Sequence, residues 1–114
     1  MPYYLLQVAY TPEAWAAMAK KPQDRIEAVR PAVEKLGGKV VAGYLAFGEY
    51  DIVAILDMRG NVDAAAFAIA VAAGGACRSV KTTPLMTTKE GMDAMKRAGA
   101  SSYRPATRAA RRRA

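Results

Sequence analysis

The run Gly-Glu-Tyr-Asp at residues 48–51 is the part of the chain best equipped for chemistry. Asp51 could serve as a base or as a carboxylate that holds a ligand, and Tyr50 as a phenolic donor. Gly48, Tyr50 and Asp51 form the motif, and Tyr44, Tyr50 and Asp51 are the candidate ligand-binding residues. The structural alternative is that Gly48 supplies a positive φ angle, Tyr50 packs and Asp51 accepts backbone hydrogen bonds. We favour this alternative, because adjacent strand residues such as Tyr50 and Asp51 point to opposite faces.

Tyrosines recur in the segments that are predicted to be strands. They could line an aromatic pocket between a sheet and its helices, although strand tyrosines more often belong to a core or an interface. The residues concerned are Tyr3, Tyr4, Tyr10, Tyr44 and Tyr50.

The chain has no histidine and one cysteine among its 114 residues. It therefore lacks imidazole for acid–base catalysis or haem ligation, and it has no second thiol for an internal disulfide. Arg78 could lower the pKa of the neighbouring Cys77 thiol. Without a histidine base, Cys77 is better interpreted as a small strand residue.

Four acidic residues in the middle of the chain could in principle bind a hard cation. Their spacing matches no cation-binding loop, so we expect neither a metal nor a cofactor. The four are Glu49, Asp51, Asp57 and Asp63.

The net charge of +7 is concentrated at the C-terminal end. Residues 1–103 carry only +2, and five arginines fall among the last eleven residues. We expect this basic tail to be disordered, because it has too few apolar residues to form a core. It is either a solvated end or a weak clamp on a polyanion such as nucleic acid, anionic lipid or an acidic protein. The five are Arg104, Arg108, Arg111, Arg112 and Arg113.

Hydrophobic periodicity and capping residues predict a β-α-β-β-α-β order followed by a last helix. Thr11 and Pro12 begin a short first helix, Asn61 caps the helix over 62–73, and Thr87 begins the last one. Pro31 either kinks or breaks the helix over 26–36. The strands are expected at 3–10, 40–47, 50–57 and 78–83, with Gly48-Glu49 as a two-residue type II′ turn.

This order is that of a ferredoxin-like α+β fold with a four-stranded antiparallel sheet. It divides the chain into a domain over residues 1–87, a C-terminal helix over 88–98 and the basic tail over 99–114. No segment resembles a signal peptide, and the longest uncharged stretch, 64–77, is shorter than the roughly 18 residues of a membrane helix. We therefore expect a cytoplasmic protein.

Both faces of the central strands are apolar. Val40, Ala42 and Tyr44 alternate with Val41, Gly43 and Leu45, and Ile52, Ala54 and Leu56 alternate with Val53 and Ile55. Since helices cover one face, a second copy of the chain is the simplest cover for the other, as in a dimeric α+β barrel. The alternatives are an open face that binds small ligands, or a face covered by the last helix.

The run from Leu45 to Val53, preceded by Leu36-Gly37-Gly38-Lys39-Val40, resembles the GYD-domain family. The resemblance extends over roughly residues 3–85. It implies a ferredoxin-like, dimeric α+β barrel domain of bacterial character with no established activity to transfer. Pro31 and the tail after Gly99 depart from the family pattern.

Three functions remain open at this point. The first is a homo-oligomeric module without catalysis, which binds a small apolar ligand or serves assembly. The second is a cofactor-independent enzyme of the monooxygenase or isomerase kind, against which the lack of histidine counts. The third is weak polyanion or nucleic-acid binding through the arginines of the tail.

Overall fold

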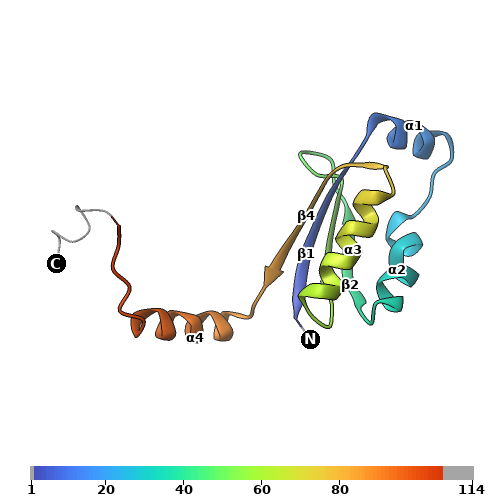
Figure 1. The fold of residues 1–114 in the computed structure, drawn as a ribbon. Coiled ribbons are helices and arrows are strands. Elements are labelled where there is room, and N and C mark those ends of the chain that lie inside the picture. The colour runs from blue at the N-terminus through green and yellow to red at the C-terminus, as the bar shows by residue number, and fades with distance from the viewer. Residues whose placement is uncertain (1, 107–114) are drawn as a thin grey trace.

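The computed structural model describes residues 2–106 and shows one four-stranded antiparallel sheet with helices on one side (Figure 1). The strands are arranged in the order β2-β3-β1-β4. This confirms the predicted α+β, ferredoxin-like fold. The elements are β1 (Tyr3–Tyr10), α1 (Pro12–Lys20), α2 (Arg25–Lys35), β2 (Lys39–Leu45), β3 (Ile52–Asp57), α3 (Asn61–Ala73), β4 (Cys77–Leu85) and α4 (Thr88–Gly99).

Side-chain caps begin three of the helices. The Ala14 N–H donates to Thr11 Oγ1 at the start of α1, and the Glu27 N–H donates to Asp24 Oδ1 at the start of α2. Each of these hydrogen bonds is 3.1 Å long. Thr87 forms the predicted capping box of α4. These bonds satisfy N–H groups that have no partner within the helix. Helix α2 runs on through Pro31, so this proline does not break it.

The start of α3 differs from the prediction. Gly60, not Asn61, is the N-cap, and no side chain caps this helix. Asn61 instead accepts a hydrogen bond from the Tyr4 hydroxyl at 2.6 Å. The side-chain amide of Asn61 therefore links β1 to α3 and accepts the hydrogen bond that the buried Tyr4 hydroxyl needs.

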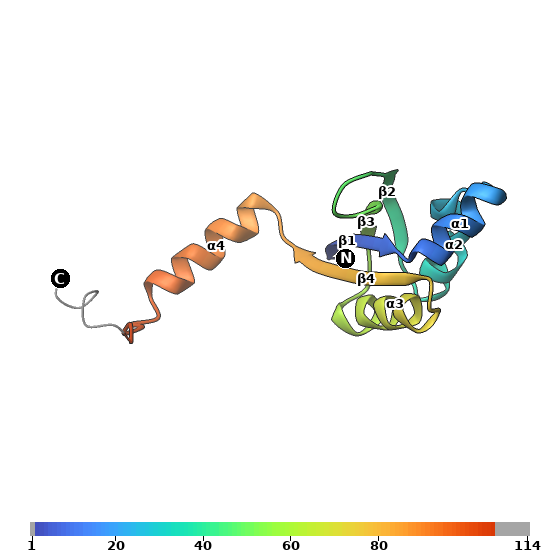
Figure 2. The same cartoon turned by 90° about the horizontal axis from the view of Figure 1, so that it is seen from above.

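The core lies between the sheet and helices α2 and α3 (Figure 2). One face of the sheet supplies most of it, and we call this the helix-covered face: Tyr4, Leu6, Val8, Tyr10, Val40, Ile52, Ala54 and Leu56. The core is completed by four more buried residues: Val33 of α2, Ala64 and Phe67 of α3, and Met58. Burying each large apolar side chain contributes about 1.5–3 kcal/mol.

A bulge at Val41 changes which residues of β2 face the helices. Val40 pairs with Leu56, but Ala42 pairs with Ile55, so β2 has one residue more than β3 there. The predicted strict alternation is therefore wrong beyond Val40, because a bulge shifts every later residue to the other face. Gly43 and Leu45 join the helix-covered face, and Ala42 and Tyr44 lie on the opposite one.

Gly43 lies directly under α2. A Cβ at this position would come within 2.6 Å of Ile26 Cδ1. The glycine therefore permits the close approach of α2 to β2.

The predicted two-residue turn between β2 and β3 is wrong as well. β2 ends at Leu45 and β3 begins at Ile52, which leaves Tyr50 and Asp51 in a six-residue loop. Gly48 does not have the positive φ angle that we expected, since Gly37 and Gly75 are the glycines with that conformation. The reason for the longer loop is a set of hydrogen bonds made by Asp51, described below.

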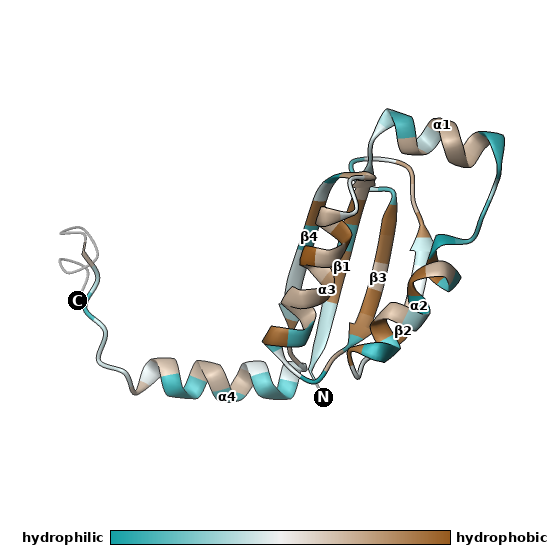
Figure 3. Cartoon of the chain, turned by 45° about the vertical axis from the view of Figure 1, so that its right-hand side comes forward, coloured by the Kyte–Doolittle hydropathy of each residue, from teal (hydrophilic) through white to brown (hydrophobic). Residues whose placement is uncertain are grey.

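Helices α2 and α3 lie on the same side of the sheet (Figure 3). The opposite face carries no helix in the described part of the chain, as the view from above shows (Figure 2), and we call it the open face. Its large apolar members are half-buried or exposed, and they include Tyr3, Leu5, Tyr44, Val53 and Ile55. Helix α4 projects away from the sheet instead of covering this face, so the last helix is not its cover (Figure 1).

Candidate functional site

A cavity of about 370 Å³ lies between the sheet and helices α2 and α3. We call it the apolar cavity. Its volume falls within the range of about 300–1,000 Å³ that small-molecule sites occupy. The walls come from the sheet and from both helices: Leu6, Val8, Val40, Ile52, Ala54 and Leu56 on one side, and Ile26, Val29, Phe67 and Val71 on the other.

Small residues on the two helices leave this space unfilled. Ala28 and Ala32 lie one turn apart on α2, and Ala70 lies one turn before Gly74, the C-cap of α3. Residues four apart share one face of a helix, so both helices turn small groups towards the gap. The cavity follows directly from the alanine content of these two segments.

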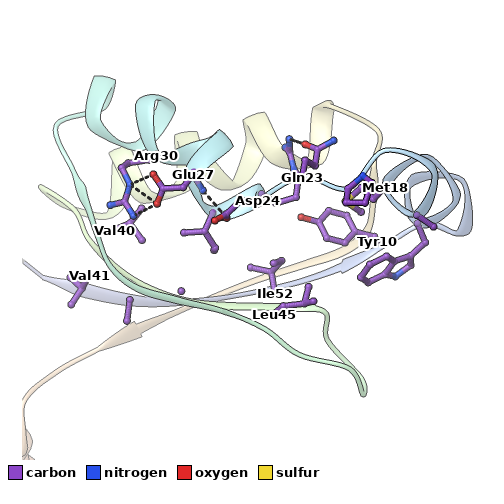
Figure 4. Close-up of a pocket in the computed structure, with 17 residues that line it drawn as sticks. Tyr10, Met18, Gln23, Asp24, Glu27, Arg30, Val40, Val41, Leu45 and Ile52 are labelled. Carbon is purple, nitrogen blue, oxygen red and sulfur yellow. Dashed lines mark hydrogen bonds and ion pairs between the residues drawn. The ribbon is translucent and has the colours of Figure 1, made fainter.

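A second cavity, of about 650 Å³, adjoins the first one between β2, α1 and the start of α2 (Figure 4). Its rim is more polar and includes Gln23, Asp24, Glu27 and Arg30. Five residues line both cavities and so mark their common boundary: Tyr10, Arg25, Ile26, Val40 and Ile52.

Tyr10, Arg25 and Cys77 form the polar end of the apolar cavity. Burial raises the pKa of the Tyr10 phenol, and the nearby Arg25 guanidinium offsets part of that rise. Burial likewise raises the pKa of the Cys77 thiol, again with a partial offset from Arg25. Both groups are therefore protonated at neutral pH, and Arg25 carries the only charge among the three. The protonated thiol agrees with the interpretation of Cys77 as a strand residue and not as a nucleophile.

Arg25 has no ion-pair partner among residues 2–106. Its Nη1 donates a hydrogen bond to Gln23 Oε1 at 2.8 Å, and its guanidinium also lies beside the Tyr10 hydroxyl. The two acidic residues nearest in sequence are engaged elsewhere: Asp24 caps α2, and Glu27 pairs with Arg30 Nη2 at 2.7 Å. A half-buried guanidinium with unused donors thus lies at the boundary of the cavities.

Asp51 is the one buried charged residue in the described chain, with 7% of its surface exposed. Its Oδ2 accepts hydrogen bonds from the Tyr10 backbone N–H at 2.9 Å and from Trp15 Nε1 at 3.2 Å. The rings of Tyr10 and Trp15 meet edge to face, with centroids 5.6 Å apart. Asp51 thereby joins the β2–β3 loop to the end of β1 and to α1, and it positions Tyr10 at the cavity.

The structure does not gather the predicted ligand residues around one cavity. Tyr44 lies on the open face with 68% of its surface exposed, and Tyr50 is half-buried in the loop. Neither they nor Asp51 line the two cavities. Gly48 is exposed. A ligand role for Tyr44, Tyr50 and Asp51 stays a prediction.

Among the five arginines predicted to bind a polyanion, Arg104 is exposed. Arg108, Arg111, Arg112 and Arg113 lie outside the described residues.

Of the five tyrosines considered for an aromatic pocket, Tyr10 lines both cavities and Tyr4 belongs to the core. Sequence reasoning missed Arg25 altogether. It follows the N-cap Asp24 and precedes the periodic Ile26, and its place at the start of α2 was the one available signal.

Metal-binding clusters of three or more Asp, Glu or Cys side chains do not occur within residues 2–106. In the same part of the chain, every helix is too short or too polar to cross a membrane.

The sheet and its covering helices define a ferredoxin-like α+β domain. A sequence model of the GYD domain matches residues 4–95, most of the chain, and the protein therefore belongs to the GYD domain family. Comparisons with curated proteins and with solved structures found no match.

Proposed function

We propose that this GYD domain is a self-associating module that binds a small, largely apolar ligand without catalysing a reaction. The observation that carries the proposal is the apolar cavity, whose polar groups lie together at one end. An apolar wall with a few convergent polar groups is typical of small-molecule sites. Because Tyr10 and Cys77 are held protonated, they suit hydrogen-bond donation better than proton abstraction or nucleophilic attack.

The open face supports self-association. Leu5, Val53 and Ile55 run across its centre, and no element of the described chain packs on them. A second copy that places its own open face there would bury both at once, with two-fold symmetry. This arrangement would give the dimeric α+β barrel that the sequence favours.

Filling the apolar cavity tests the binding proposal. Ala70 and Ala72 are both exposed on α3, but Ala70 lines this cavity, whereas Ala72 lies on the opposite side of the helix and does not line it. With Nile red as a neutral probe, we expect Ala70→Phe to weaken binding at least about tenfold and Ala72→Phe to leave it unchanged. Equal binding by the wild type and Ala70→Phe, or no binding by the wild type, contradicts the proposal.

A second candidate function rests on the charge distribution. Five arginines among the last eleven residues make this end a candidate polyanion clamp. Labelled DNA and RNA should bind the full chain better than a variant ending at Ala100, with a salt slope of about −0.9 per phosphate neutralised. Equal binding by both proteins, or by neither at low salt, contradicts this function.

A further inference from the structure

The half-buried position of Arg25 indicates that the ligand carries an anionic group in addition to its apolar part. The residue lines both cavities, so its guanidinium lies where an apolar chamber meets a more polar one. A positive charge that has left bulk water loses hydration free energy unless an anion or a set of acceptors replaces the water. Within residues 2–106, its side-chain neighbours are the Gln23 amide and the Tyr10 hydroxyl, which are both neutral, and it forms no ion pair.

The acidic groups around Arg25 do not supply that anion. Asp24 accepts the Glu27 N–H. Glu27 accepts hydrogen bonds from Nε and Nη2 of Arg30, at 3.2 and 2.7 Å, so its charge is paired with that neighbour on α2. Asp51 binds Tyr10 N–H and Trp15 Nε1 through one oxygen. The carboxylates nearest to the cavities are thus committed to structural bonds.

The two other groups at the polar end complement an anion. The Tyr10 hydroxyl and the Cys77 thiol stay protonated, because burial raises the pKa of both. Each can then donate a hydrogen bond to an oxygen atom of a bound anion. A guanidinium also offers parallel N–H donors whose spacing matches the two oxygens of a carboxylate.

We propose that the ligand is an amphiphilic carboxylic acid, whose carboxylate binds Arg25 and Tyr10 and whose hydrocarbon part occupies the apolar cavity among Leu6, Ala54 and Phe67. This inference rests on the proposed binding function and names the class of ligand for the same cavity. A neutral or cationic amphiphile of the same length leaves Arg25 without a counter-ion and binds less tightly.

The experiment compares three probes with one chain length on the full protein: decanoate, decanol and decylamine, each measured by displacement of Nile red at neutral pH. We expect decanoate to bind at least about tenfold more tightly than decanol, since the hydrogen bonds between its carboxylate and the Arg25 guanidinium are assisted by opposite charges. Decylamine should bind least.

Arg25→Gln should abolish the preference for decanoate while leaving decanol binding in place, which also shows that the cavity has survived the substitution. Tyr10→Phe keeps the ring against Trp15 and should weaken decanoate severalfold. Lys35→Gln removes one positive charge from the far end of α2 and serves as the matched control, with no change expected.

Equal affinities of the wild type for decanoate and decanol overturn the inference, and so does a preference that persists in Arg25→Gln. In both cases the proposed binding function stands. If none of the three probes displaces Nile red, the binding function itself fails. The two failures are therefore distinguishable.

Discussion

The helix-covered face and the open face of the sheet are built from similar side chains, yet they differ in what lies over them. Ile52, Ala54 and Leu56 are buried under α2 and α3, whereas the alternating residues Val53 and Ile55 are only half-buried. Apolar alternation on both faces of β3 thus predicts that both need a cover. It does not predict the cavity that remains between the helix-covered face and its helices.

The largest effect that separates the two faces should come from a charge placed on each. Ile52→Lys should destabilise the fold by at least about 3 kcal/mol, because an unpaired charge would be buried in the core. Val53→Lys, one residue further on, should leave the domain folded and shift it towards the monomer. Urea denaturation and sedimentation velocity measure the two outcomes.

Two results would break this comparison. If Ile52→Lys unfolds at the same urea concentration as the wild type, the helix-covered face is not a core. If Val53→Lys and the wild type sediment alike as oligomers, the open face is not the contact between copies.

A smaller effect is expected where the loop is fixed to the helix-covered side. Asp51→Ala leaves the Tyr10 N–H and Trp15 Nε1 without their acceptor and should cost about 1–3 kcal/mol in urea denaturation. Asp51→Asn retains an oxygen acceptor and should cost less. Wild-type stability of Asp51→Ala would show that this buried carboxylate does not anchor the loop.

Alkaline pH should lower the free energy of unfolding through two groups on the helix-covered side, Cys77 and Tyr10. The pKa values of Cys77 and Tyr10 are raised by burial above their ordinary values of 9.0 and 10.0. The folded state therefore holds these protons to higher pH than the unfolded state, so stability is full below pH 9 and declines as the pH rises through this range. Chemical denaturation from pH 8 to 11 measures the decline.

Cys77→Ser should delay the start of that decline to nearer pH 10, and the further variant Tyr10→Phe should remove the remaining contribution of these two groups. A decline that is unchanged in the double variant would assign it to other residues.

The smallest effect should come from α4, which touches neither face. Met92 and Met95 are exposed on this helix, so replacing both with serine should change the unfolding free energy of the domain by less than about 0.5 kcal/mol. Thermal unfolding followed by circular dichroism tests this. A larger loss would mean that α4 packs against the domain in solution.

The order of elements was predictable because it depends on local signals. Thr11 and Thr87 lie where their side chains cap helices, and the alternation in β3 assigns its residues to the correct faces. These features require only neighbours within a few residues.

The register of β2 and the candidate site depend on contacts between distant segments. The bulge at Val41 has no local signature, and the bonds of Asp51 reach 41 and 36 residues back along the chain. The role of Arg25 likewise arises only when α2 is placed above Tyr10 and Cys77. The short Gly-Glu-Tyr-Asp run identified the family, and the favoured interpretation of Asp51 as an acceptor of backbone hydrogen bonds agrees with its bond from the Tyr10 N–H. Its partners Tyr10 and Trp15 could not be named from the sequence.

The glycine under α2 affects the shape of the two cavities. Gly43 permits the short distance between α2 and the sheet. A methyl group there would collide with three carbon atoms of the Ile26 side chain, the nearest at 2.6 Å. Ile26 lines both cavities, so a displacement of its side chain would change the volume of each. Substitution of this glycine would therefore force the Ile26 side chain to move and would change the shape of both cavities, while their other lining residues stay the same.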